Sequence, residues 1–222
     1  MILVGLTGGY CTGKNSVAAL MEERGWTSVD VDRLGHLAVE RRKAEIVARF
    51  EAEARAFLGR GILDAVGRLD RRALGALVFA DPAKLADHEA IVHPAMFALL
   101  DESLAELDGK ARKAGREARI LVNAAILYKM PVALRCDCII EVHAPLLARL
   151  ARARRRDKLG IPAALARIRR QAPLWNLRDP AGPPRLILRN SGRPEGLGAK
   201  LDRVLARSGR AGFAKSEAQE GR

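Results

Sequence analysis

Short apolar runs alternate along the chain with longer stretches whose apolar positions recur at helical spacing. Five of the short runs have the composition of β-strands, and they cover residues 2–6, 27–31, 120–124, 138–142 and 186–188. Strands that alternate with helices usually form a parallel sheet. The pattern therefore predicts an α/β fold with a parallel five-stranded sheet flanked by helices.

The residues between the second and third strands are rich in Ala, Leu, Arg and Glu at helical spacing. Asp81 followed by Pro82 is typical of a helix start, and residues 67–70 indicate the turn into an earlier helix. His93-Pro94 is expected to end the helix that begins near Pro82. We therefore expect an all-helical insertion at this point of the chain.

Basic residues gather after the fourth strand. Helices are expected over residues 145–158 and 162–171, and between residues 149 and 170 there are nine Lys or Arg and one acid. Residues 173–184 contain four prolines and are expected to form an irregular connection to the last strand. Residues 208–222 are small and polar, a composition that predicts disorder.

The segment from Gly8 to Asn15 follows the phosphate-binding pattern G-x-x-x-x-G-K-[ST] at every fixed position except the last. It lies between the first strand and a helix-forming segment, which is the context that the motif requires. Glycines let successive backbone N–H groups point toward phosphate oxygens, and the lysine reaches the outer phosphates. The segment therefore predicts a nucleotide site at Gly9, Tyr10, Cys11, Thr12, Gly13, Lys14, Asn15 and Ser16.

Oxygen donors for Mg²⁺ stand in the loop and at the end of the second strand. Asn15 replaces the hydroxyl residue that usually binds the ion, and Ser16 follows it, so the ligand can be either residue or water. Asp30 and Asp32 have period two and are expected to project from one side of an extended segment. Either carboxylate can hold metal or accept a proton, or Asp32 can cap the following helix.

Arg152 and Arg156 are four residues apart and therefore share one face of a helix, from which they can clamp phosphates and neutralise developing charge. Nearly all of the neighbouring basic residues are interpreted as solvated: Arg149, Arg154, Arg155, Arg169 and Arg170. His93 is as consistent with a structural role as with a substrate contact. Tyr128 and Trp175 are too far apart in the sequence to indicate a site.

The net charge of +13 suits either nucleic acid or an anionic small molecule. Aromatic residues are 4% of the chain and do not interleave with the basic segment, so nucleic-acid binding is the minor hypothesis. Three cysteines without a C-x-x-C pair favour a reducing compartment and folding without disulfides. Because no apolar segment approaches the length of a membrane span or has the form of a signal peptide, a cytoplasmic protein is expected.

Five motifs, in this order along residues 2–205, resemble those of dephospho-coenzyme A kinase, a family of P-loop kinases that act on small molecules. They are residues 5–14, Asp30-Val31-Asp32, residues 69–79 with 91–94, the arginine pattern from Arg152 to Gln171, and Asn190-Ser191-Gly192. The chain departs from the family at Cys11, Thr12 and Asn15. It also has Tyr128-Lys129 where the family has a carboxylate.

The resemblance implies transfer of the ATP γ-phosphate, with Mg²⁺, to the ribose 3′-hydroxyl of dephospho-coenzyme A, which is the last step of coenzyme A synthesis. It implies that Arg71 and His93 face the acceptor. The implied parts are a nucleotide core (1–40, 116–148 and 172–207), a helical acceptor domain (41–115) and a lid (149–171), followed by the tail (208–222).

By position, the resemblance also implies roles for individual residues. Asp32 would be the base and Lys14 would bridge the ATP phosphates. Arg152 and Arg156 would serve the lid, and Asn190 would lie by the adenine. The departures leave two alternatives open, a catalytically impaired nucleotide-binding homologue and a kinase of another small alcohol. A monomer or a small homo-oligomer is expected.

Overall fold

The computed structural model describes residues 1–191 and 196–207. Gly192 and the tail at 208–222, for which disorder is predicted, lie outside the described residues. The chain divides into two compact units, which are considered separately: Met1–Asp30 with Ala105–Arg222, called the sheet unit, and Val31–Leu104, called the helical unit.

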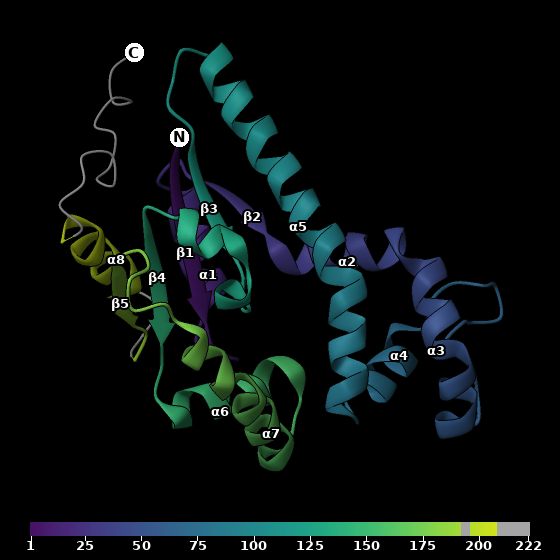
Figure 1. The fold of residues 1–222 in the computed structure, drawn as a ribbon. Helices are drawn as coiled ribbons and strands as arrows, with labels where there is room; N and C mark the ends of the chain where they lie inside the picture. Colours follow the sequence, from purple (N-terminus) through teal and green to yellow (C-terminus); the bar gives the residue numbers. More distant parts are fainter. Residues whose placement is uncertain (192–195, 208–222) are drawn as a thin grey trace. The chain divides into compact units, whose positions relative to one another are not determined.

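The sheet unit contains five parallel strands in the order β2-β3-β1-β4-β5, as Figure 1 shows. The strands are β1 (Ile2–Gly8), β2 (Thr27–Asp30), β3 (Arg119–Asn123), β4 (Cys138–His143) and β5 (Arg185–Arg189). The predicted α/β fold with a parallel five-stranded sheet is confirmed. Each strand lies within two residues of its predicted bounds. The central strands β1, β3 and β4 are buried almost throughout and therefore read as apolar runs, whereas β2 and β5 at the sides of the sheet are partly exposed.

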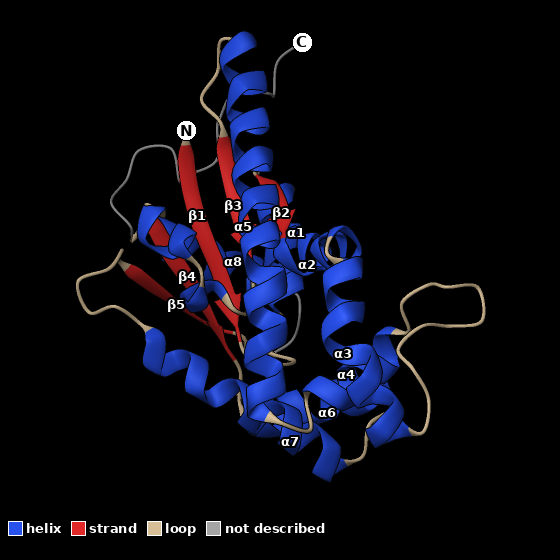
Figure 2. Cartoon of the chain, turned by 45° about the vertical axis from the view of Figure 1, so that its right-hand side comes forward, coloured by secondary structure: helices blue, strands red, loops and turns tan. Residues whose placement is uncertain are grey.

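Helices α1 (Lys14–Glu22) and α8 (Leu197–Ala206) pack on this sheet (Figure 2). Helices α6 (Leu146–Asp157) and α7 (Ile161–Gln171) pack on each other beyond the ends of the strands, and the 3₁₀ helices are η1 (Leu127–Lys129), η2 (Pro131–Arg135) and η3 (Ala172–Leu177). The prediction of an irregular connection over residues 173–184 is wrong for residues 173–177, because they lie in η3, which continues directly from α7. Residues 178–184 lie in no helix or strand, as predicted. Within residues 1–191 and 196–207, none of the helices has both the length and the apolar character needed to cross a bilayer.

The core of the sheet unit forms on both faces of β1, the central strand. On one face Leu6 packs in a cluster with Met21 of α1 and Leu201 of α8, all fully buried. On the other face the chain comes so close that a Cβ at Gly5 would lie 2.7 Å from Cδ2 of Leu127 in η1. A larger residue at position 5 would therefore force the Leu127 side chain to shift.

The helical unit is built from α2 (Val31–Arg41), α3 (Lys43–Leu58), α4 (Arg71–Val78) and the first part of α5 (Pro82–Lys113), which continues into the sheet unit. The predicted helix starts are confirmed. The Asp70 carboxylate accepts hydrogen bonds from the N–H groups of Arg72 and Ala73, and the Asp81 carboxylate accepts one from Ala83 N–H at 2.9 Å.

The prediction that His93-Pro94 ends a helix is wrong, because α5 runs through Pro94 to Lys113. A proline inside a helix costs about 3 kcal/mol. However, Val92, Met96 and Leu99 on either side of it are buried, and burying one such side chain contributes about 1.5–3 kcal/mol. Burial along the helix therefore outweighs the local cost of the proline.

The expected period-two alignment of Asp30 and Asp32 is also wrong. Strand β2 ends at Asp30, and α2 begins at Val31, so the alternation of faces stops between the two carboxylates. Asp32 instead lies in the first turn of α2, where a carboxylate interacts favourably with the helix dipole. The two acids belong to different units of the chain.

Candidate nucleotide site

The glycine-rich loop follows the central strand of the sheet. Strand β1 lies between β3 and β4, with Gly8 paired to Val142 and Leu6 paired to Asn123. Asp30, at the end of β2, is also paired to Asn123. The carboxyl ends of these strands therefore share one edge of the sheet, the edge at which parallel sheets bind ligands.

Gly13 turns the loop into helix α1. Its φ of 94° is in the left-handed region, and a Cβ there would lie 2.2 Å from Nδ2 of Asn190, so only glycine fits. The first turn of α1 carries no acidic residue. The positive end of the helix dipole is therefore not offset by a carboxylate of its own first turn, which suits an anion such as phosphate.

Cys11 also has a positive φ, 59°, although it is not glycine. A side chain in this region costs roughly 1–2 kcal/mol. The Cys11 side chain is buried in a small cluster with Ala153 of α6 and Ala164 of α7. The Cys11 side chain, at a position where the resemblance implies glycine, therefore packs the loop against both helices of the predicted lid.

Lys14 begins α1, and its ammonium lies at the carboxyl ends of the strands; 8% of the residue's surface is exposed. Its Nζ donates a hydrogen bond to Oδ1 of Asn123, which is itself 4% exposed. Sequence reasoning missed Asn123. The available signal was a polar residue at the end of an otherwise apolar strand.

Asn190 and Arg152 both bind the phosphate loop at Thr12. The carbonyl oxygen of Thr12 accepts hydrogen bonds from Asn190 Nδ2 at 2.8 Å and from Arg152 Nη1 at 3.1 Å. Arg152 Nη2 also donates to Asn190 Oδ1 at 3.2 Å. The structure therefore brings together the loop, the first lid arginine and Asn190, all predicted as site residues.

Arg156 lies on the same helix as Arg152 but has different partners. It forms two hydrogen bonds to the Asp157 carboxylate, at 2.8 and 2.9 Å, and lies 5.5 Å from the Tyr10 ring centroid. The Tyr10 hydroxyl also donates to Asp157. Arg156 first and Tyr10 second lower the pKa of Asp157 to about 2, whereas burial, followed by the hydrogen bond to Asp157, raises the pKa of Tyr10.

A small recess opens beside the loop, lined in part by Gly8, Gly9, Tyr128, Gln171 and Trp175. Gln171, the last residue of α7, accepts a hydrogen bond from the Tyr10 N–H through Oε1. Tyr128 and Trp175, which are too distant in the sequence to indicate a site, have ring centroids 6.2 Å apart. Folding thus places both rings next to the phosphate loop.

The remaining predicted residues are placed as follows. Asn15 and Ser16 are exposed in the first turn of α1, and Asp30 is half-buried at the end of β2. Arg71, in the helical unit, begins α4 and pairs with Glu40 at 3.0 Å. His93 lies inside α5 of the same unit, with its ring centroid 5.4 Å from that of Phe97.

A parallel sheet whose central strand leads through a glycine-rich loop into a helix, with arginine-bearing helices packed on that loop, defines a P-loop kinase fold. Residues 2–193 match the family model of dephospho-CoA kinase. The chain belongs to the dephospho-CoA kinase family.

Similar proteins support this assignment. The chain is 38% identical over 209 residues to the dephospho-CoA kinase of Anaeromyxobacter dehalogenans, covering 93% of this chain and 92% of that one. It is 35% identical to that of Thermus thermophilus, covering 92% and 91%. A crystal structure of a Thermus thermophilus protein is 34% identical, covers 93% of this chain and 97% of that one, and has a TM-score of 0.70.

Proposed function

We propose that this protein transfers the γ-phosphate of ATP to the ribose 3′-hydroxyl of dephospho-coenzyme A, giving coenzyme A and ADP. The observation that carries the proposal is the phosphate loop, with Lys14 and Arg152 held against it, in a chain that matches the dephospho-CoA kinase family over residues 2–193. Phosphoryl transfer depends mainly on positioning and on charge stabilisation. Both can be supplied by a loop and helices of this kind.

The loop and the start of α1 are proposed to bind the phosphates. Backbone N–H groups of the loop and of the first turn of α1 would donate to phosphate oxygens at the positive end of the helix dipole. The N–H groups of Tyr10, Thr12 and Ser16 are not counted among them, because they donate to Gln171, Gly9 and Gly13. The hydrogen bond to Asn123 holds the Lys14 ammonium at the same edge of the sheet. Arg152 and Arg156 would neutralise the charge that develops during transfer, and Asn190 would lie by the adenine.

Asp32 is proposed as the base that accepts the proton of the acceptor hydroxyl, and Arg71 and His93 as contacts to the acceptor. These roles are supported by the family resemblance. Asp32 is exposed in the first turn of α2, so a ligand in solution can reach this part of the helix.

Asn15, Ser16 and Asp30 are the residues proposed to hold Mg²⁺. They offer an amide, a hydroxyl and a carboxylate oxygen, the hard donors that this ion prefers, and none of them is buried. When bound, the ion neutralises charge on the β- and γ-phosphates.

The test is acceptor-dependent formation of ADP by the purified protein with ATP, Mg²⁺ and dephospho-coenzyme A. We expect Lys14→Ala to lower kcat/KM by at least about 100-fold, as loss of a charge-stabilising donor typically does. Lys110→Ala is the matched control, because Lys110 is exposed on α5 and pairs with Glu106. It lies on the turn next to Asp108, which is 3.9 Å from the amino group of Met1 at the opposite end of β1.

Two outcomes would contradict the proposal. ATP binding without turnover would favour the impaired nucleotide-binding homologue, for which Asn15 in the hydroxyl position is the specific reason. Turnover with another alcohol, but not with dephospho-coenzyme A, would favour a kinase with a different acceptor.

A further inference from the structure

A buried carboxylate, Glu141, lies in the middle of the sheet unit. Its surface is 2% exposed, and it has partners on three sides. The Tyr128 hydroxyl donates to Oε1 at 2.6 Å, Arg178 Nη2 donates to Oε2 at 2.8 Å, and His143 Nε2 lies 3.0 Å from Oε2. Glu141 is therefore the centre of a polar cluster, which we call the Glu141 cluster: Tyr128, Glu141, His143 and Arg178.

The position of Glu141 is costly without these partners. Strand β4 otherwise buries apolar side chains, including Ile139, Ile140 and Val142. A carboxylate in such surroundings is tolerated when it is paired and hydrogen-bonded. The three partners of Glu141 therefore offset the cost of burying it.

The partners of Glu141 come from two separate connections of the chain. Tyr128 lies in η1, which follows β3, and Arg178 directly follows η3. The Arg178 guanidinium also lies 4.5 Å from the Trp175 ring centroid, and the Trp175 ring is stacked on His143 at 5.4 Å. Two contacts therefore hold η3 against strand β4. Arg178, next to η3, donates to Glu141, and Trp175, within η3, stacks on His143.

The fastened segment is the base of the predicted lid. Helix α7 ends at Gln171 and continues without a break into η3. Gln171 accepts a hydrogen bond from the Tyr10 N–H in the phosphate loop, and Trp175 lines the recess beside that loop. A shift of η3 on β4 would therefore move Gln171, and with it α7, relative to the loop.

We propose that Glu141 is a positioning residue of the lid: through Arg178 it fixes η3, and through η3 it sets the place of Gln171 and α7 against the phosphate loop. The inference rests on the proposed function, because the lid arginines act there in phosphoryl transfer. Glu141 itself does not touch the reacting groups in this account.

Two variants test the contact between Glu141 and Arg178, one at each residue. Glu141→Gln keeps the shape and removes the charge. Arg178→Ala removes the η3 partner and leaves Glu141 with Tyr128 and His143; since the Arg178 side chain is 29% exposed, this variant is expected to fold even if the first does not. Arg203→Ala, an exposed arginine on α8 that donates to its own helix, is the matched control.

The experiment compares kcat and the KM for ATP among the variants, and it maps the first tryptic cleavage sites by mass spectrometry. Both are done at a temperature at which circular dichroism shows that all variants are folded. Misplacement of a catalytic group by about 1 Å can cost about 100-fold, so we expect kcat to fall by about 10- to 100-fold in both variants. The KM for ATP should change much less. Faster cleavage after Arg167, Arg169 or Arg170 is expected in both variants and not in the control.

The proposal would be overturned if the folded variants had the kcat of the wild type. It would also be overturned if cleavage after Arg167, Arg169 and Arg170 were no faster in the variants than in the control. Arg178→Lys keeps the charge but not the planar guanidinium that lies over the Trp175 ring, so it should recover only part of the kcat lost in Arg178→Ala. If the wild-type protein forms no ADP with the acceptor, the proposed function fails. The proteolysis comparison would still decide whether Glu141 holds the lid base.

Discussion

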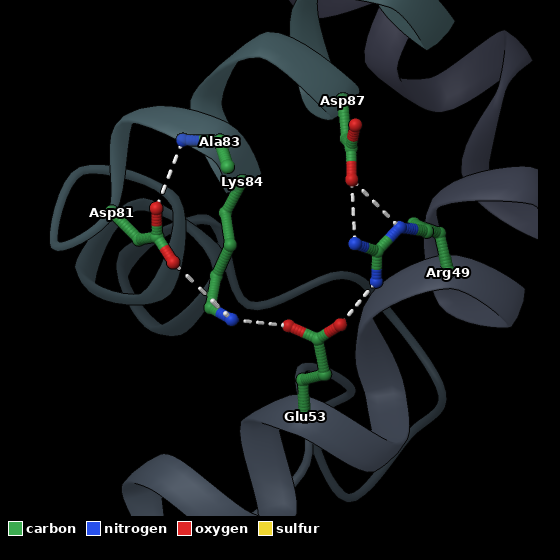
Figure 3. Close-up of polar contacts among 6 residues, drawn as sticks. All are labelled: Arg49, Glu53, Asp81, Ala83, Lys84 and Asp87. Carbon is green, nitrogen blue, oxygen red and sulfur yellow. Dashed lines mark hydrogen bonds and ion pairs between the residues drawn. The ribbon is translucent and has the colours of Figure 1, made fainter.

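Two groups of charged residues, one in each unit, show how differently ion pairs can serve a protein. In the helical unit, Arg49 and Glu53 of α3 pair with Asp87 and Lys84 of α5, and Lys84 also reaches Asp81 (Figure 3). These side chains keep between 26% and 47% of their surface exposed. In the sheet unit, the carboxylate of Glu141 is 2% exposed.

The difference lies in what happens when a partner is lost. Water and salt can replace any member of the exposed network, so pairs of this kind contribute little to stability. Glu141 has no such replacement, and neither has the part of Arg178 that is buried beside it. The stability that ion pairs add to a region therefore depends more on how exposed each pair is than on how many pairs there are.

The largest effect is expected when the buried charge is removed. Glu141→Gln should lower the free energy of unfolding by about 2 kcal/mol, less than the 3–5 kcal/mol of a fully buried pair because Arg178 is partly exposed. Urea unfolding followed by circular dichroism measures this. Glu106→Gln, at an exposed pair on α5, is the control. Equal midpoints for the two variants would show that burial does not set the contribution of these carboxylates.

An intermediate effect is expected at Asp157, which joins Arg156 to Tyr10. Its pKa is lowered to about 2, so its contribution to stability is complete above its ordinary pKa, near 4, and is lost as the pH falls through 2. Asp157→Asn should therefore be less stable than wild type at neutral pH, and the difference should vanish between about pH 4 and pH 2. Urea midpoints across this range measure it, and a difference that persists at pH 2 would contradict the assignment.

The parts predicted correctly from sequence are those whose cause is local. The strands follow from apolar runs, and the phosphate loop from glycines and a lysine at fixed spacing between a strand and a helix. Asn190 and Arg152 also lie where the motif order suggests, against the loop at Thr12. Whether Asn190 lies by the adenine remains a prediction.

The parts that were missed depend on residues far apart in the chain. Tyr128, Glu141 and Arg178 have no common spacing, and their meeting depends on the order of the strands. The helix through Pro94 was mispredicted because buried side chains on both sides outweigh the proline. Local propensity could not reveal that burial, since it depends on which segments fold against α5.

The smallest effect should come from the exposed network itself. In Glu53→Gln, Arg49 keeps Asp87 and Lys84 keeps Asp81, so no cation is left without an acid. Lys84 first and Arg49 second lower the pKa of Glu53, so its ion pairs contribute stability above its ordinary pKa, and this contribution is lost as the pH falls through the lowered pKa. The variant should therefore be slightly less stable than wild type at neutral pH. Because salt screens exposed charges, urea midpoints of the two proteins should coincide in about 1 M NaCl. A loss as large as that of Glu141→Gln, or one that salt does not reduce, would mean that the network holds α3 on α5 as firmly as the buried cluster holds η3 on β4.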